Sequence, residues 1–94
     1  MTPRQSGLQQ QVLALYRRAL RMTTAKPALA RPKFRLFVHY HFRKNAAISP
    51  RDIGTVEYLL RQGIKQVDMY ENPSIRDCHL TYDMLEWARR NNRR

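Results

Sequence analysis

Few side chains in this sequence could act as nucleophiles, proton carriers or metal ligands. The candidates are three histidines and a single cysteine, namely His39, His41, Cys78 and His79. On a helix, His39 and His41 would project about 200° apart, so they could not share a metal ion. Cys78 and His79 are adjacent but lack a second ligand pair, and one thiol cannot supply the four cysteines of an ordinary iron–sulfur cluster. The sequence therefore predicts no metal and no cofactor of the chain's own.

Motifs that accompany catalysis are also missing. The sequence contains no glycine-rich phosphate loop and no clustered pair of carboxylates. The four candidate side chains match no known catalytic signature. We therefore predict that the protein is not an enzyme.

Charge is the clearest compositional signal. The 94 residues contain 18 Lys and Arg but only 7 Asp and Glu, a net charge of +11, and no acid precedes Asp52. Such an excess favours an anionic partner, which can be nucleic acid, an anionic membrane face or an acidic protein. An acid-free amphipathic start is also typical of mitochondrial import. The single cysteine suits a reducing compartment, and no apolar run approaches the length of about 18 residues that spans a bilayer.

Apolar spacing predicts an all-α fold without strands. We expect a first helix over about 7–22 with Ser6 as N-cap, a second over about 33–47, and a third that starts at Ser49-Pro50 and ends near Glu71. A short helix is expected within 81–91. Residues 1–73 would form a three-helix antiparallel bundle, and residues 74–94 a basic C-terminal extension.

The predicted helices have more than one apolar side. The core stripe of the first helix consists of Leu8, Val12, Leu15, Ala19 and Met22. A second apolar stripe beside it consists of Leu13, Tyr16 and Leu20. The second stripe either docks on another protein or is buried inside the bundle. The predicted core stripe of the third helix consists of Ile53, Val56, Leu60, Gly63, Ile64 and Val67. Its opposite, basic face consists of Arg51, Tyr58, Arg61, Gln62, Lys65 and Met69. Gly63 would permit a close helix crossing.

The order and spacing of several segments resemble the LYR-motif family of small basic mitochondrial proteins. The similarity includes Leu15-Tyr16-Arg17 within residues 8–17, Phe42 within 42–46, and the segment 53–66 with its Glu57-Tyr58-Leu59-Leu60-Arg61-Gln62-Gly63 core. It covers about residues 8–70. The resemblance implies a three-helix protein of the mitochondrial matrix.

This resemblance also implies a role and partners. The branch of the family that it favours matures the iron–sulfur subunit of succinate dehydrogenase (complex II) by linking it to a cluster-transfer cochaperone. Carried over by residue, the cochaperone would contact Leu15, Tyr16, Arg17 and Phe42. The client subunit would contact Tyr58, Arg61 and Lys65.

Two alternatives remain open. Other branches of the family bind an acylated acyl carrier protein, and the apolar excess of the first two helices could line an acyl tunnel. A small RNA-binding protein is also compatible with the charge. We rank it lower because the aromatic residues of the second helix lie on apolar faces and form no stacking platform, so we expect no nucleic-acid partner.

Overall fold

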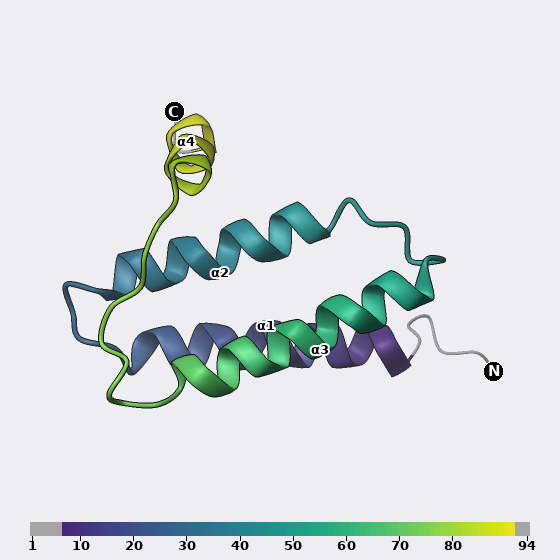
Figure 1. The fold of residues 1–94 in the computed structure, drawn as a ribbon, viewed down its shortest axis with the longest axis horizontal. Coiled ribbons are helices and arrows are strands. Elements are labelled where there is room, and N and C mark those ends of the chain that lie inside the picture. Colours follow the sequence, from purple (N-terminus) through teal and green to yellow (C-terminus); the bar gives the residue numbers. More distant parts are fainter. Residues whose placement is uncertain (1–6, 92–94) are drawn as a thin grey trace.

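The computed structural model describes residues 7–91, which form four helices and no strand. The helices are α1 (Gly7–Thr24), α2 (Arg31–Asn45), α3 (Ile53–Tyr70) and α4 (Tyr82–Asn91). Helices α1, α2 and α3 alternate in direction, so each runs antiparallel to the next along the chain, and α4 is seen end-on beside α2 (Figure 1). The all-α prediction and its short C-terminal helix are confirmed.

The predicted start of the third helix is wrong. Helix α3 begins at Ile53, and the cap is Asp52, whose carboxylate accepts bonds from the Thr55 backbone N–H at 3.3 Å and from its hydroxyl at 2.8 Å. The Ser49 hydroxyl oxygen instead accepts from the Arg51 N–H within the preceding turn. A carboxylate bonds an N-terminal amide and favours the positive end of the helix dipole, so Asp52 prevails over Ser49.

The other boundaries shift by only a few residues. Helix α2 starts at Arg31 because Pro32 is accommodated in its first turn, where the missing N–H costs nothing. Helix α1 extends two residues past its predicted end to Thr24. The predicted cap Ser6 lies outside the described residues.

Helix α1 is the centre of the bundle. It packs along both α2 and α3, and α4 packs on α2. The backbones of α2 and α3 stay apart, and these two helices meet through side chains, since the Tyr70 ring of α3 packs edge to face on Phe34 and Phe37 of α2 at 5.8 and 5.3 Å between ring centres. The buried apolar residues of the three main helices are Leu15, Ala19, Met22, Phe34, Val38, Leu60 and Val67. On α1, Leu15, Ala19 and Met22 are buried, and Leu8 and Val12 are half-buried against them, which confirms the predicted core stripe of the first helix.

For the apolar faces, the structure decides one open alternative and corrects one prediction. The second stripe of α1 is mostly used inside the bundle, because Tyr16 and Leu20 are half-buried against the core and only Leu13 is exposed. On α3, Ile53 is 56% exposed and Ile64 also faces solvent. These two residues lie at one edge of the predicted stripe, beyond the reach of α1.

A buried lysine anchors the connector between α3 and α4. The Lys26 ammonium donates to the carbonyl oxygens of Asn72 and Ile75 at 3.2 and 2.6 Å, and it lies 5.1 Å from the centre of the Phe34 ring. Helix α4 then packs on the outer side of α2, where the rings of Tyr40 and Trp87 meet edge to face at 5.9 Å. The back of α2 is therefore covered by the chain itself.

Candidate interaction surfaces

The three residues Leu15, Tyr16 and Arg17 occupy three different environments. Leu15 is 7% exposed and belongs to the core, Tyr16 is half-buried, and Arg17 is exposed. Consecutive residues of a helix project about 100° apart, which explains this division. Only Arg17 and the open edge of Tyr16 are available to a partner.

Tyr16 is held by α2. Its ring meets Phe42 edge to face at 4.8 Å and lies 6.2 Å from the ring of His39. Phe42 is itself half-buried. The structure thus brings together Tyr16 and Phe42, two of the residues that the resemblance assigns to one contact, and it packs Tyr16 partly against the core.

The two neighbouring arginines have opposite roles. The Arg18 guanidinium donates two bonds of 2.8 Å to the Glu71 carboxylate and also pairs with Asp68. These hydrogen bonds lower the pKa of Glu71 below its ordinary value. No such partner of Arg17 exists among residues 7–91. Arg18 therefore fastens α1 to α3, whereas the charge of Arg17 is free for another molecule.

The predicted basic face of α3 is exposed. Tyr58 is 54% exposed, and Arg61 and Lys65 are exposed one and two turns further along the same face. Met69 extends this surface with a half-exposed thioether. Helix α3 therefore presents cationic and apolar groups side by side, as interfaces with acidic protein partners do.

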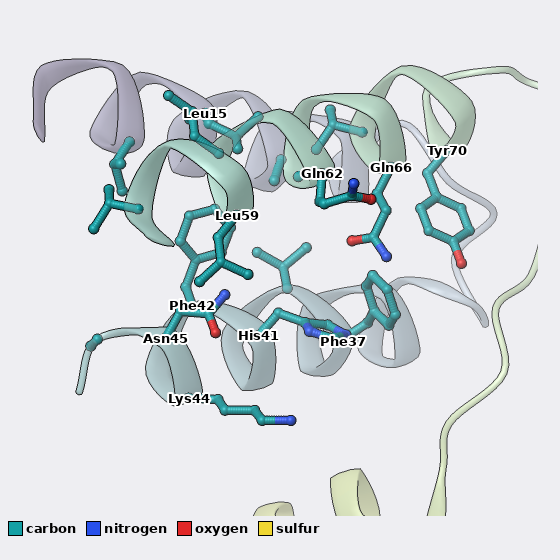
Figure 2. A pocket seen from close by; sticks show the side chains of 18 of the residues that line it. Leu15, Phe37, His41, Phe42, Lys44, Asn45, Leu59, Gln62, Gln66 and Tyr70 are labelled. Carbon is teal, nitrogen blue, oxygen red and sulfur yellow. The ribbon is translucent and has the colours of Figure 1, made fainter. Parts of the chain in front are cut away.

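An apolar groove of about 430 Å³ lies between α2 and α3. Helix α1 contributes apolar side chains including Leu15, and Figure 2 shows Gln66 and Tyr70 of α3 pointing toward Phe37 and His41 of α2. This volume falls in the range of ordinary ligand sites. The groove exists because α2 and α3 both pack on α1 while their own backbones stay apart, and the two helices meet through the Tyr70 ring at the end of α3.

Polar groups lie along the groove. Gln62 and Gln66 line it from α3, one helical turn apart, and Gln66 points toward α2. Lys44 and Asn45 contribute to its rim on α2, and the Lys44 ammonium lies 5.7 Å from the centre of the Tyr40 ring. Burial lowers the pKa of the His41 imidazole, and the nearby Lys44 lowers it further. The sequence analysis placed Val56, Leu60, Gly63 and Val67 in the core stripe and Gln62 on the basic face, but it gave Leu59, Gln66 and Tyr70 no place in a groove. The only signal of this wall is a Gln–Gln pair at i, i+4 beside the apolar stripe.

Neither a metal site nor a membrane span is found in the part of the chain that the structure describes. There, no three His, Cys, Asp or Glu side chains are grouped closely enough to hold a metal ion. No helix within residues 7–91 combines the length and apolarity that crossing a membrane requires.

Comparison with known proteins gives consistent matches. The family described as Complex 1 protein (LYR family) matches residues 10–69. The chain is 43% identical over 76 residues to "Succinate dehydrogenase assembly factor 1, mitochondrial" of Schizosaccharomyces pombe, covering 81% of this chain and 96% of that protein.

Two further relatives have the same name. The protein of Saccharomyces cerevisiae is 35% identical over 79 residues, which cover 84% of this chain and all (100%) of that protein. The protein of Bos taurus is 43% identical over 67 residues, which cover 70% of this chain and 52% of that protein. No solved structure matches the chain significantly.

Proposed function

The chain belongs to the LYR family, and we propose that it is a non-enzymatic mitochondrial assembly factor for succinate dehydrogenase. In this role it links the iron–sulfur subunit of that enzyme to a cluster-transfer cochaperone in the matrix. The observation that carries the proposal is the name shared by its relatives over most of this chain. The cluster is cargo passed between the partners, and this chain holds the partners.

The proposed cochaperone contact is built around Arg17. Arg17 is exposed and unpaired within the described residues, and it follows directly on Tyr16, which Phe42 holds in place. A guanidinium can form two parallel hydrogen bonds with a carboxylate, which gives direction as well as affinity. Leu15 supports this contact from the core, and Phe42 supports it by orienting Tyr16.

The proposed client contact is the exposed face with Tyr58, Arg61 and Lys65. It lies on α3, whereas Arg17 lies on α1, so the two contacts use side chains of different helices. Tyr58 offers contact area at a low entropic cost, and the two cations select an acidic surface. A two-surface adaptor requires this separation.

Affinity capture from mitochondria tests the proposal. Arg17→Ala is expected to weaken recovery of the cochaperone several-fold and to leave the iron–sulfur subunit unchanged. Arg61→Ala with Lys65→Ala is expected to do the reverse. Arg76→Ala is a matched control, since this arginine is exposed and lies in the connector after α3.

Three results would contradict the proposal. In the first, the wild-type chain recovers neither the iron–sulfur subunit nor the cochaperone. In the second, it recovers a different respiratory complex. In the third, each variant remains folded and loses both partners equally, so that a single composite surface replaces the two proposed here.

The groove between α2 and α3 favours a second candidate function. Its apolar walls and its volume suit an acyl chain, and Lys44 at its end suits the acidic surface of a carrier protein. In that case the chain is an accessory subunit that binds an acylated acyl carrier protein. Intact-mass measurement of the native complex would reveal an acylated carrier in fixed stoichiometry, and recovery of the chain without a carrier would exclude this function.

A further inference from the structure

A second groove, of about 550 Å³, lies on the other side of α2, where α4 packs. Its lining comes from three helices and includes Tyr16, Arg35, His39, Arg43, Trp87 and Asn91. Helix α4 lies beyond residues 10–69, which the family description matches. The wall formed by Trp87 and Asn91 is therefore an addition to the matched part of the chain.

The charge of this second groove is not balanced by the protein itself. None of its lining residues is acidic. Four acids of the described chain are paired elsewhere, two of them with Arg18, Asp77 with Lys33 at 2.9 Å, and Glu86 with Arg89 at 2.6 Å. Arg35 and Arg43 are exposed and have no acidic partner within residues 7–91.

The spacing of the basic side chains has a helical repeat. Arg35, His39 and Arg43 follow one another at i, i+4 and i+8, so neighbouring members are about 6 Å apart along one face of α2. Acidic side chains one turn apart on a partner helix have the same repeat. Trp87 and Leu36 supply apolar surface beside this row.

We propose that the second groove is the docking site for an acidic helical segment of a protein partner. Carboxylates of that segment pair with Arg35 and Arg43, while an apolar side chain packs against Trp87. Because Tyr16 borders the groove and Arg17 follows it, we assign the segment to the cochaperone, a step that rests on the proposed function. Helix α4 thus widens the cochaperone surface beyond the three-residue motif.

The aromatic groups favour a protein over RNA as the occupant. Trp87 is half-buried with its ring edge to face with Tyr40, at an interplanar angle of 81°. Tyr16 is held edge to face with Phe42 at 63°. Single-stranded RNA is usually bound on aromatic faces that are open for stacking, whereas both of these rings are half-buried and packed against another ring.

Calorimetric titration of the purified cochaperone into the full chain provides the first test. Arg35→Gln with Arg43→Gln is expected to weaken binding about tenfold or more, and Trp87→Ala about fivefold. The control Arg51→Gln with Arg76→Gln removes the same charge outside the groove and is expected to change binding less than about threefold. Circular dichroism of each variant confirms that the helices are retained. Equal losses in the groove pair and the control pair would overturn the proposal.

A second probe separates the groove from the proposed function. A fluorescent helical peptide with Glu at every fourth position is expected to bind the wild-type chain, and Arg35→Gln with Arg43→Gln to abolish that binding. If this occurs but the cochaperone does not bind, the groove stands and the proposed function fails. If Arg17→Ala weakens the cochaperone and the groove variants change neither ligand, the proposed function stands and the groove fails. Tighter binding of a single-stranded RNA oligonucleotide than of the peptide would also overturn it.

Discussion

Helix α1 packs closely against α3, whereas α2 and α3 leave an open groove between them. On the closed side, a Cβ atom added to Gly63 would lie 2.8 Å from a methyl carbon of Leu15, and Arg18 binds Asp68 and Glu71. On the open side, the backbones of α2 and α3 stay apart, and the two helices meet through the Tyr70 ring, which packs on Phe34 and Phe37. The comparison indicates that α1 and α3 interlock closely, whereas α2 contributes Phe34 and Val38 to the core and leaves other side chains to line a groove.

Side-chain size explains the difference. Gly63 lets the Leu15 side chain lie directly on the backbone of α3, so the two helices approach closely. At the open side, the aromatic rings of Phe37 and Phe42 and the amides of Gln62 and Gln66 stand between the helices. Amides that keep contact with water avoid the cost of burial. The two helices therefore stay apart beside the glutamines and meet where Tyr70 packs on Phe34 and Phe37.

The largest contrast is expected between two leucines. Leu15 is buried against Gly63 on the closed side and also reaches the groove, whereas Leu59 is half-buried in the groove wall. Leu15→Ala removes a buried side chain from the closed side and is expected to lower the free energy of unfolding by about 2–5 kcal/mol. Leu59→Ala removes a half-buried side chain from the wall of the open groove, and a loss of about 1 kcal/mol is expected. Urea denaturation of both variants measures the difference, and equal losses would show that the two sides contribute alike.

A smaller effect is expected from filling the close crossing. Gly63→Val is expected to destabilise the protein by about 1–3 kcal/mol, because its methyl groups would overlap Leu15. Gly54→Val is the matched control, since nothing lies within 4 Å of a Cβ atom at that position. It should change stability by less than about 0.5 kcal/mol.

Thermal unfolding of a double variant sharpens this prediction. If Gly63 and Leu15 interlock, Gly63→Val combined with Leu15→Ala should lose about 1 kcal/mol less than the two separate losses added together. Strict additivity would mean that the valine acts somewhere else, such as on helix propensity.

The closed side was largely predictable from sequence. The periodic spacing of Leu15, Ala19 and Met22 determines which face of α1 is buried, and a glycine within the apolar stripe of α3 indicates the close crossing. The start of α3 was not, because Ser49-Pro50 and Asp52 both have the chemistry of a cap. Which of them begins the helix depends on the path of the loop from α2.

The open side could not be predicted in the same way. An apolar face on α2 is compatible with packing on α3 or on α4, and periodicity alone does not distinguish these. Leu36 and Tyr40, on the back of α2, are covered by α4 from about 45 residues later in the chain. Likewise, the sequence identifies Tyr16 and Arg17 but cannot reveal that Phe42 restrains one of them and leaves the other free.

The smallest effect is expected from two neighbouring arginines. Arg18→Ala is expected to lower the free energy of unfolding by about 1 kcal/mol near pH 7, because it removes the link between α1 and the end of α3. Arg17→Ala should change it by less than about 0.5 kcal/mol. Denaturant titration of both variants tests the proposed division, and a larger loss in Arg17→Ala would show that this arginine is structural.

Acid titration of stability then separates the two sides of the bundle. The lowered pKa of Glu71 means that the Arg18 link is fully present above the ordinary value of 4.5 and is lost as pH falls through the folded-state value. The pKa of His41 in the open groove is also lowered, so stability starts to fall as pH drops below its ordinary value of 6.5. His41→Gln should therefore flatten the curve just below pH 6.5, and Arg18→Ala should flatten it below pH 4.5. A single transition that neither substitution alters would mean that the open and closed sides do not titrate separately.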